Sequence, residues 1–144
     1  LSITIPVGAV NGWTDHLGSS ASSAGRVDPV DLTNLIGLVV DAVDEFALLH
    51  PDHIRVGRRT IIDGPHATEL ARLETGDASS RSVTVDRATI EELFRLLATD
   101  DRPGRASNPG VAESAADSVL AAACITAALT RALDPSDCEI GRSR

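Results

Sequence analysis

The sequence predicts an α/β fold in which a small sheet packs against helices, in a single domain over residues 1–144. Three observations predict this class. Short segments near residues 60 and 82 have the composition of strands, whereas longer segments place apolar residues at helical spacing. Strand and helix patterns alternate along the chain, which is the order expected of an α/β unit. A chain of 144 residues also has room for one hydrophobic core.

The first quarter of the chain predicts an extended segment, a loop and a long helix. Residues 2–10 alternate apolar with small or polar residues, and Pro6 restricts this strand to a sheet edge or to an early end. Residues 11–26 have no regular pattern, and residues 18–25 within them have the composition of a flexible surface loop. Asp28 followed by proline is a helix start, and apolar residues continue at three- and four-residue steps to Leu49.

The rest of the chain alternates short strands with amphipathic helices. The predicted elements are a strand at 54–62, a helix ending at Gly76, an extended piece at 82–85, a helix capped by Asp86, a turn-rich loop at 100–110, a helix at 113–133 and a strand at 138–140.

Composition excludes several classes of function. The net charge of −8 argues against binding to nucleic acid or to an anionic membrane. No basic segment precedes an apolar one at the start, and the longest uncharged stretch is too short to span a bilayer, so we expect a soluble, cytoplasmic protein. Two cysteines without close spacing predict reduced, buried thiols. The chain starts inside an apolar run and has no methionine, which predicts a fragment of a longer polypeptide.

The turn at Asp63-Gly64-Pro65 is the candidate functional site. An apolar run stops there, and a helical pattern begins directly afterwards. A strand, a tight turn and a helix can direct backbone N–H groups and a helix N-terminus at an anion. The alternative is a simple connection between two elements. No metal is predicted at His50 and His53, because Pro51 breaks their helical spacing and no cysteine or third histidine stands nearby.

Three blocks, in order, resemble the second, C-terminal domain of the exopolyphosphatase/guanosine pentaphosphate phosphatase (Ppx/GppA) family. Residues 2–10 resemble the family's SLPLGAVRLT strand, and residues 61–73 are similar to its VGTGGTxxxLAxL strand, loop and helix. The third block has two parts: residues 83–97 resemble the helix that begins TLT, and residues 109–123 resemble PGLxxxRADxIxAGA. The resemblance covers nearly the whole chain.

This resemblance implies part of an actin-like, ribonuclease-H-like fold of two domains with a phosphate-binding cleft between them. It also implies magnesium-dependent hydrolysis of terminal phosphoanhydrides in polyphosphate or guanosine pentaphosphate, and it is compatible with a homodimer. The implied partner is a phosphate-containing small molecule or polyphosphate. The phosphate-binding or substrate-binding positions that it implies are Asp63, Gly64, His66 and Thr68. Arg58 and Arg59 are further candidate anion contacts.

The chain also departs from the family pattern. The family's first phosphate loop, its acidic general base and its DIGGGS loop all precede the strand at which this chain begins, so no catalytic residue is carried over. The GTGGT loop falls on residues 62–66, where only Gly64 matches. Pro65 lacks an N–H group, and Asp63 would repel an anion unless magnesium lies between them.

Three interpretations follow. In the first, the chain supplies the second wall of a phosphatase cleft and is inactive alone, because hydrolysis also needs a carboxylate base and magnesium. In the second, it is a non-catalytic phosphate- or nucleotide-sensing or interaction domain of the same fold. In the third, it is an α/β domain with an accidental resemblance.

Overall fold

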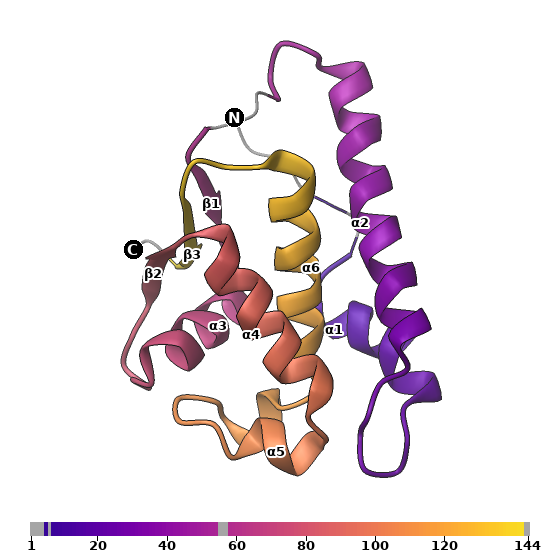
Figure 1. The fold of residues 1–144 in the computed structure, drawn as a ribbon, viewed down its shortest axis with the longest axis vertical. Coiled ribbons are helices and arrows are strands. Elements are labelled where there is room, and N and C mark those ends of the chain that lie inside the picture. The colour runs from indigo at the N-terminus through magenta and orange to yellow at the C-terminus, as the bar shows by residue number, and fades with distance from the viewer. Residues whose placement is uncertain (1–4, 6, 55–57, 143–144) are drawn as a thin grey trace.

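The computed structural model describes residues 5, 7–54 and 58–142, and confirms the predicted α/β class (Figure 1). Its sheet has three strands: β1 (Thr60–Ile62), β2 (Ser82–Val85) and β3 (Cys138–Gly141). Their order is β1–β3–β2, with β3 parallel to β1 and antiparallel to β2. The strand that comes last in the sequence is therefore the central one.

The long helix α2 (Pro29–Leu49) forms as its periodicity predicts. The Asp28 carboxylate accepts a hydrogen bond from the Val30 N–H at 2.8 Å, which satisfies one of the free donors of the first turn. Its buried face packs mainly against α6 (Ser118–Leu133). That face consists of Leu32, Leu35, Val39 and Val43.

Helix α6 is the centre of the molecule. It packs against α2 on one side and α4 (Arg87–Thr99) on another, so most of its circumference is buried (Figure 1). Its alanine-rich sequence lets these neighbours approach closely. The predicted helix over 113–133 is shorter in the structure, because residues 113–115 form a separate 3₁₀ turn.

The N-terminal prediction is not confirmed over the residues that can be compared. Residues 1–4 and 6 lie outside the described part, Ile5 and Val7 are not in a strand, and Ala9 and Val10, at the end of the predicted pattern, belong to a short helix, α1 (Ala9–Gly12). Helical turns continue through residues 13–20, where a loop was predicted. The reason is tertiary: Ala9 and Gly12 are buried, and α1 packs against α6. This packing outweighs the alternating pattern of the local sequence.

The remaining elements follow the predictions with two differences. Helix α3 (Pro65–Thr75) ends at Gly76, whose φ of +66° needs glycine, and Asp86 caps α4 through the Thr89 N–H at 2.8 Å. The predicted strand over 54–62 is confirmed only at Thr60–Ile62: Ile54, Arg58 and Arg59 are described but are not in a strand, and residues 55–57 lie outside the described part.

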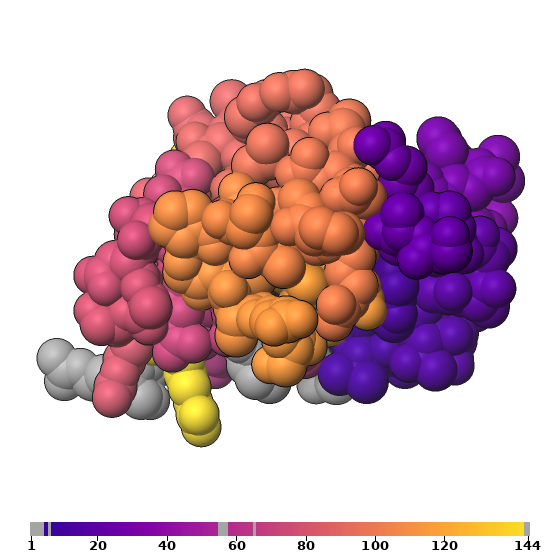
Figure 2. All heavy atoms as spheres, turned by 90° about the horizontal axis from the view of Figure 1, so that it is seen from below, coloured from indigo at the N-terminus to yellow at the C-terminus, as the bar shows by residue number. Residues whose placement is uncertain are grey.

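The predicted loop over 100–110 contains a second difference, the short helix α5 (Arg102–Ala106). Asp101 caps it by accepting a hydrogen bond from the Gly104 N–H at 2.9 Å. Seen from below in Figure 2, the orange segment around α5 lies directly against the indigo N-terminal segment. A backbone hydrogen bond of 2.8 Å from Arg102 N–H to the Ala24 carbonyl joins the two.

Both cysteines are free and buried, as predicted. Burial raises the pKa of the Cys124 thiol to about 12 and that of Cys138 to about 11, so both remain protonated near neutral pH. Among the described residues, no helix combines the length and apolar character that crossing a bilayer requires.

Candidate functional site

An open groove of about 1050 Å³ lies between the N-terminal segment, the C-terminal end of β1 and one face of α6. The predicted turn forms part of its wall. Of the four predicted site residues, Asp63, Gly64 and His66 line the groove. Thr68 is not among the lining residues, and its hydroxyl instead donates back to the Gly64 carbonyl at 3.5 Å.

Gly64 shapes the turn through its backbone conformation. Its φ of +150° and ψ of 164° lie in a region that favours glycine, although a Cβ atom there would meet nothing within 4 Å. Helix α3 begins at the next residue and has no side-chain cap. The N–H groups of its first turn lack partners within the helix, and the helix dipole makes this end positive. Gly64, His66 and Ala67 place this end on the groove, where it favours an anion.

Two arginines and a histidine stand along the same wall. Arg58, Arg59 and His53 line the groove together with the turn. Arg59 is already neutralised, because it contacts Glu139 at 2.6 Å and Asp137 at 3.6 Å. Arg58 is exposed, and its side chain has no hydrogen-bond or ion-pair partner among the described residues. Arg58 is therefore the guanidinium available to an incoming anion.

His66 has an unusual environment for a residue at a groove wall. Its Nδ1 atom is buried and lacks a hydrogen-bond partner, a property shared among the described side chains only by Glu69 Oε2. A buried polar atom without a partner costs about 1–3 kcal/mol. Such costs are concentrated at functional sites, because a ligand can supply the missing contact.

The floor of the groove is mainly apolar. Residues of α6 form it, and these are Ala122, Ile125, Thr126, Leu129 and Leu133. Among the described lining residues, Asp63 is the one carboxylate. No three His, Cys, Asp or Glu side chains of the described residues could together hold a metal ion. The groove thus offers anion contacts on its wall and a single acid.

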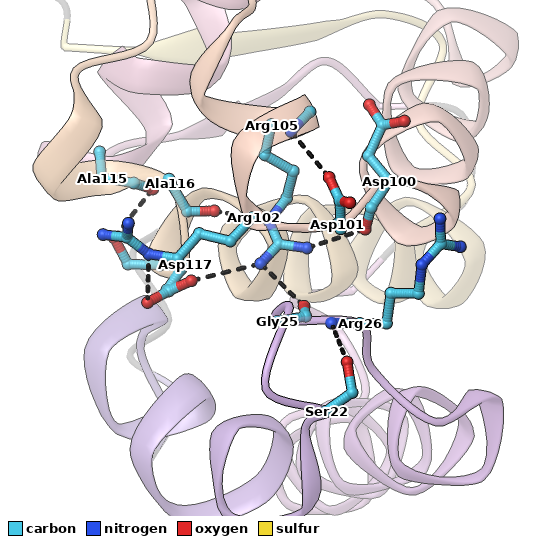
Figure 3. A network of polar contacts seen from close by, with 12 residues as sticks. Ser22, Gly25, Arg26, Asp100, Asp101, Arg102, Arg105, Ala115, Ala116 and Asp117 are labelled. Atoms are coloured by element: carbon cyan, nitrogen blue, oxygen red, sulfur yellow. Dashed lines mark hydrogen bonds and ion pairs between the residues drawn. The ribbon is translucent and has the colours of Figure 1, made fainter.

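Sequence reasoning missed a second polar cluster, built around Arg105 (Figure 3). Its side chain is completely buried, and it donates to the carbonyls of Ala116 at 2.7 Å, Asp100 at 3.0 Å and Gly25 at 3.1 Å. It also pairs with Asp117 at 3.2 Å. Burial lowers the pKa of the Arg105 guanidinium, and the hydrogen bond and charge of Asp117 oppose that shift.

The Arg105 cluster joins three segments that are far apart in sequence. Arg102 pairs with the second oxygen of Asp117 at 3.3 Å, and the Trp13 ring lies 5.6 Å from the Arg105 guanidinium carbon. The donors of Arg105 are paired within the protein, which indicates a structural role. The sequence contains one indication of this cluster: Asp117 belongs to one of the blocks that carry the family resemblance.

Known structures share this fold. A Ppx/GppA phosphatase of Aquifex aeolicus, in its type II variant, matches with a TM-score of 0.76 over 96% of this chain and 44% of its own, at 14% identity. The chain has the Ppx/GppA fold. A second Aquifex aeolicus PPX-GPPA structure matches with a TM-score of 0.75 over 94% of this chain and 44% of its own, at 13% identity. An exopolyphosphatase from Cytophaga hutchinsonii matches with a TM-score of 0.66 over 85% of this chain and 40% of its own, at 12% identity.

The predicted actin-like α/β fold is therefore confirmed. The chain spans about 44% of the length of the first two Ppx/GppA structures. Neither a protein-family model nor a curated protein matches the sequence. The fold is thus shared at sequence identities of 12% to 14%.

Proposed function

We propose that this chain is part of a Ppx/GppA-like phosphatase and forms the second wall of its phosphate-binding cleft. The reaction is the hydrolysis of terminal phosphoanhydrides in inorganic polyphosphate or guanosine pentaphosphate. The catalytic base and the main phosphate loops lie outside these 144 residues. The observation that carries the proposal is the α3 N-terminus, which opens on a groove in the fold of known phosphatases.

The groove wall supports this proposal through its charge. The protein has a net charge of −8, yet Arg58, whose side chain has no partner among the described residues, lines this groove beside the positive end of α3. A phosphate group prefers such a wall, because it meets a guanidinium and free backbone donors together. The main opposing charge is Asp63, which is exposed at the end of β1.

Magnesium is part of the proposal, but the described residues do not form a site for it. They provide one groove carboxylate, Asp63, and no set of three ligands. Magnesium in phosphate sites is commonly held by one or two carboxylates together with substrate phosphates. We therefore derive no step through the ion.

The test compares phosphate release by two proteins. The 144-residue chain should release no inorganic phosphate from long-chain polyphosphate or guanosine pentaphosphate, because it lacks a general base. The longer polypeptide that we expect to contain it should release phosphate with Mg²⁺ and stop when EDTA is added. Release by the 144 residues alone would disprove the assignment of the catalytic base to another segment. No release by the purified longer polypeptide would reject the phosphatase proposal.

A non-catalytic phosphate or nucleotide sensor is the second candidate, and the chemistry of the turn favours it. Pro65 supplies no N–H where the Ppx/GppA loop has a glycine, and Asp63 places a negative charge beside the anion position. Titration calorimetry with guanosine pentaphosphate distinguishes the two. Binding without turnover by the longer polypeptide supports the sensor, and turnover excludes it.

We further propose that the protein acts in the cytoplasm, where such ligands are dissolved, and that it forms a homodimer. Sedimentation velocity measurements on the 144-residue chain test the second point, since a dimer doubles the mass of 15.0 kDa.

A further inference from the structure

The outward face of α2 is a second unusual surface, separate from the groove. Helix α2 lies along one flank of the molecule, with the rest of the protein on one side (Figure 1). Its 3.6-residue repeat places Val30, Gly37, Asp41, Asp44 and Leu48 on the side opposite the buried face. We call these five residues the α2 outer face.

Large apolar side chains on this helix are unusually exposed. Leu48 is 83% exposed and Val30 is 63% exposed, at opposite ends of the α2 outer face. Leu49, at the edge of the face, is 70% exposed. Leu48 and Leu49 are the two most exposed large apolar residues in the described part of the chain. Isolated exposed leucines need no explanation, but several on one helix face indicate a contact surface.

Gly37 lies in the middle of this face. A Cβ atom there would meet nothing within 4 Å, so no packing inside the protein requires glycine. Glycine inside a helix is about 1 kcal/mol less favourable than alanine. A glycine on an outward helix face allows another backbone to approach closely. Its position between the exposed Val30 and Leu48 indicates that the approaching element runs along α2.

Charge identifies the occupant. Residues 28–54 contain six acidic residues and no Lys or Arg, which leaves fifteen acids against thirteen arginines in the rest of the chain. Most of the net charge of −8 therefore comes from this one segment. A second copy of α2 would bring like charges together, which opposes self-association through this face. A cationic partner is complementary to it.

We propose that the α2 outer face binds an amphipathic, Arg- or Lys-rich α-helix of a partner protein. The partner's backbone crosses at Gly37, its apolar side chains cover Val30 and Leu48, and its cations pair with Asp41 and Asp44. One helix of 21 residues offers a small interface, so the complex is transient and sensitive to salt. This inference does not depend on the proposed phosphatase function.

The probe is a dye-labelled synthetic 21-residue helix with a Leu/Ala seam and Arg flanks, measured by fluorescence anisotropy against the 144-residue chain. A peptide with the same seam and Glu flanks is the matched ligand control. We expect binding of the basic peptide only, weakening at least about tenfold between 50 and 300 mM salt. No binding of the basic peptide, or equal binding of both, would reject the proposal.

Two variants separate a docked helix from simple charge attraction. Gly37→Leu fills the approach site and leaves charge unchanged, and we expect at least about tenfold weaker binding, or about 1.4 kcal/mol. Leu48→Ser should also weaken binding. Ala88→Leu places the same leucine side chain at an exposed position of α4 and should leave binding unchanged, as should Glu74→Gln on α3. Thermal unfolding confirms that each variant is folded.

The remaining outcomes of these measurements also support or overturn the proposal. Binding that is insensitive to both Gly37→Leu and Leu48→Ser would show non-specific charge attraction and overturn the proposal. Self-association in sedimentation velocity, abolished by Leu48→Ser, would assign the face to a second copy and overturn it as well. Peptide binding that depends on Gly37 and Leu48 but not on Ala88 confirms the docked helix.

Discussion

The two ends of α6 lie in contrasting polar environments. Just before its first turn, the buried Arg105 has partners for its donors in Gly25, Asp100, Ala116 and Asp117. Along its later turns, α6 forms the floor of an open groove whose wall carries Arg58 without a side-chain partner in the described residues. The first environment is a closed internal network, and the second still has capacity for a ligand.

This contrast distinguishes charged side chains that stabilise the fold from charged side chains that can bind a ligand, and it depends only on their burial and partners in this structure. A charge that is buried and fully paired stabilises the fold, and removing one partner is costly. A charge that is exposed and unpaired contributes little to folding and remains available for binding. The four predictions below test this separation, from the largest expected effect to the smallest.

Arg105→Met should lower the free energy of unfolding by about 3–5 kcal/mol, because it leaves three carbonyls without this donor and the Asp117 carboxylate with Arg102 alone. Urea denaturation followed by circular dichroism measures the change. Arg81→Ala is the control, since Arg81 is exposed and its side chain has no partner among the described residues. Equal stability of the two variants would show that the Arg105 cluster is not structural.

Gly25→Ala should destabilise the same region by about 1–3 kcal/mol. Gly25 has a φ of +79°, and a Cβ atom there would lie 2.8 Å from Arg102 Cβ. Gly37→Ala is the matched control: it adds the same methyl group in open space on a helix and should stabilise by up to about 1 kcal/mol. Thermal melts of the two variants should therefore move in opposite directions. Shifts of the same sign would contradict the backbone argument.

Arg58→Ala should leave stability within about 0.5 kcal/mol of the parent and weaken guanosine pentaphosphate binding about fivefold, or about 1 kcal/mol. Titration calorimetry on the 144-residue chain measures the affinity. Arg81→Ala removes an equal charge outside the groove and should bind as the parent does. Equal weakening by both variants would mean that net charge alone, and not the groove, sets the affinity.

The smallest effect concerns the surface pair Glu91 and Arg131, joined by two hydrogen bonds of 2.7 Å. These hydrogen bonds lower the pKa of Glu91. The pair therefore stabilises the fold above the glutamate's unfolded pKa of about 4.3, and this contribution is lost as pH falls through the lower folded value. Glu91→Gln should cost about 0.5 kcal/mol at pH 7 and nothing at pH 2, by urea denaturation. A cost that does not change with pH would exclude an ionic origin.

Local patterns predicted the elements whose signals are local. Helices α2 and α4 are specified by N-cap residues, Asp28 and Asp86, and by the spacing of their apolar residues. These signals act between residues a few positions apart, so they can be recognised in the sequence. Helix α1 was missed because its formation depends on packing against α6, more than a hundred positions later in the chain. An alternating apolar pattern cannot show that dependence.

The candidate site was predicted in part for the same reason. Asp63, Gly64 and His66 follow from the turn itself, and they line the groove. Thr68 faces back along α3, because its hydroxyl finds the Gly64 carbonyl one turn earlier. The contact between Arg105 and Gly25 joins positions 80 apart, and no spacing rule in the sequence reports such a pair.

The position of β3 has a consequence for how the protein folds during synthesis. β1 and β2 each pair only with β3 in the described structure, and β3 is synthesised after both of them. Until residues 138–141 are made, β1 and β2 expose unpaired strand edges, and the helices alone can form local contacts. The nascent chain should therefore need protection from edge-to-edge aggregation until β3 completes the sheet.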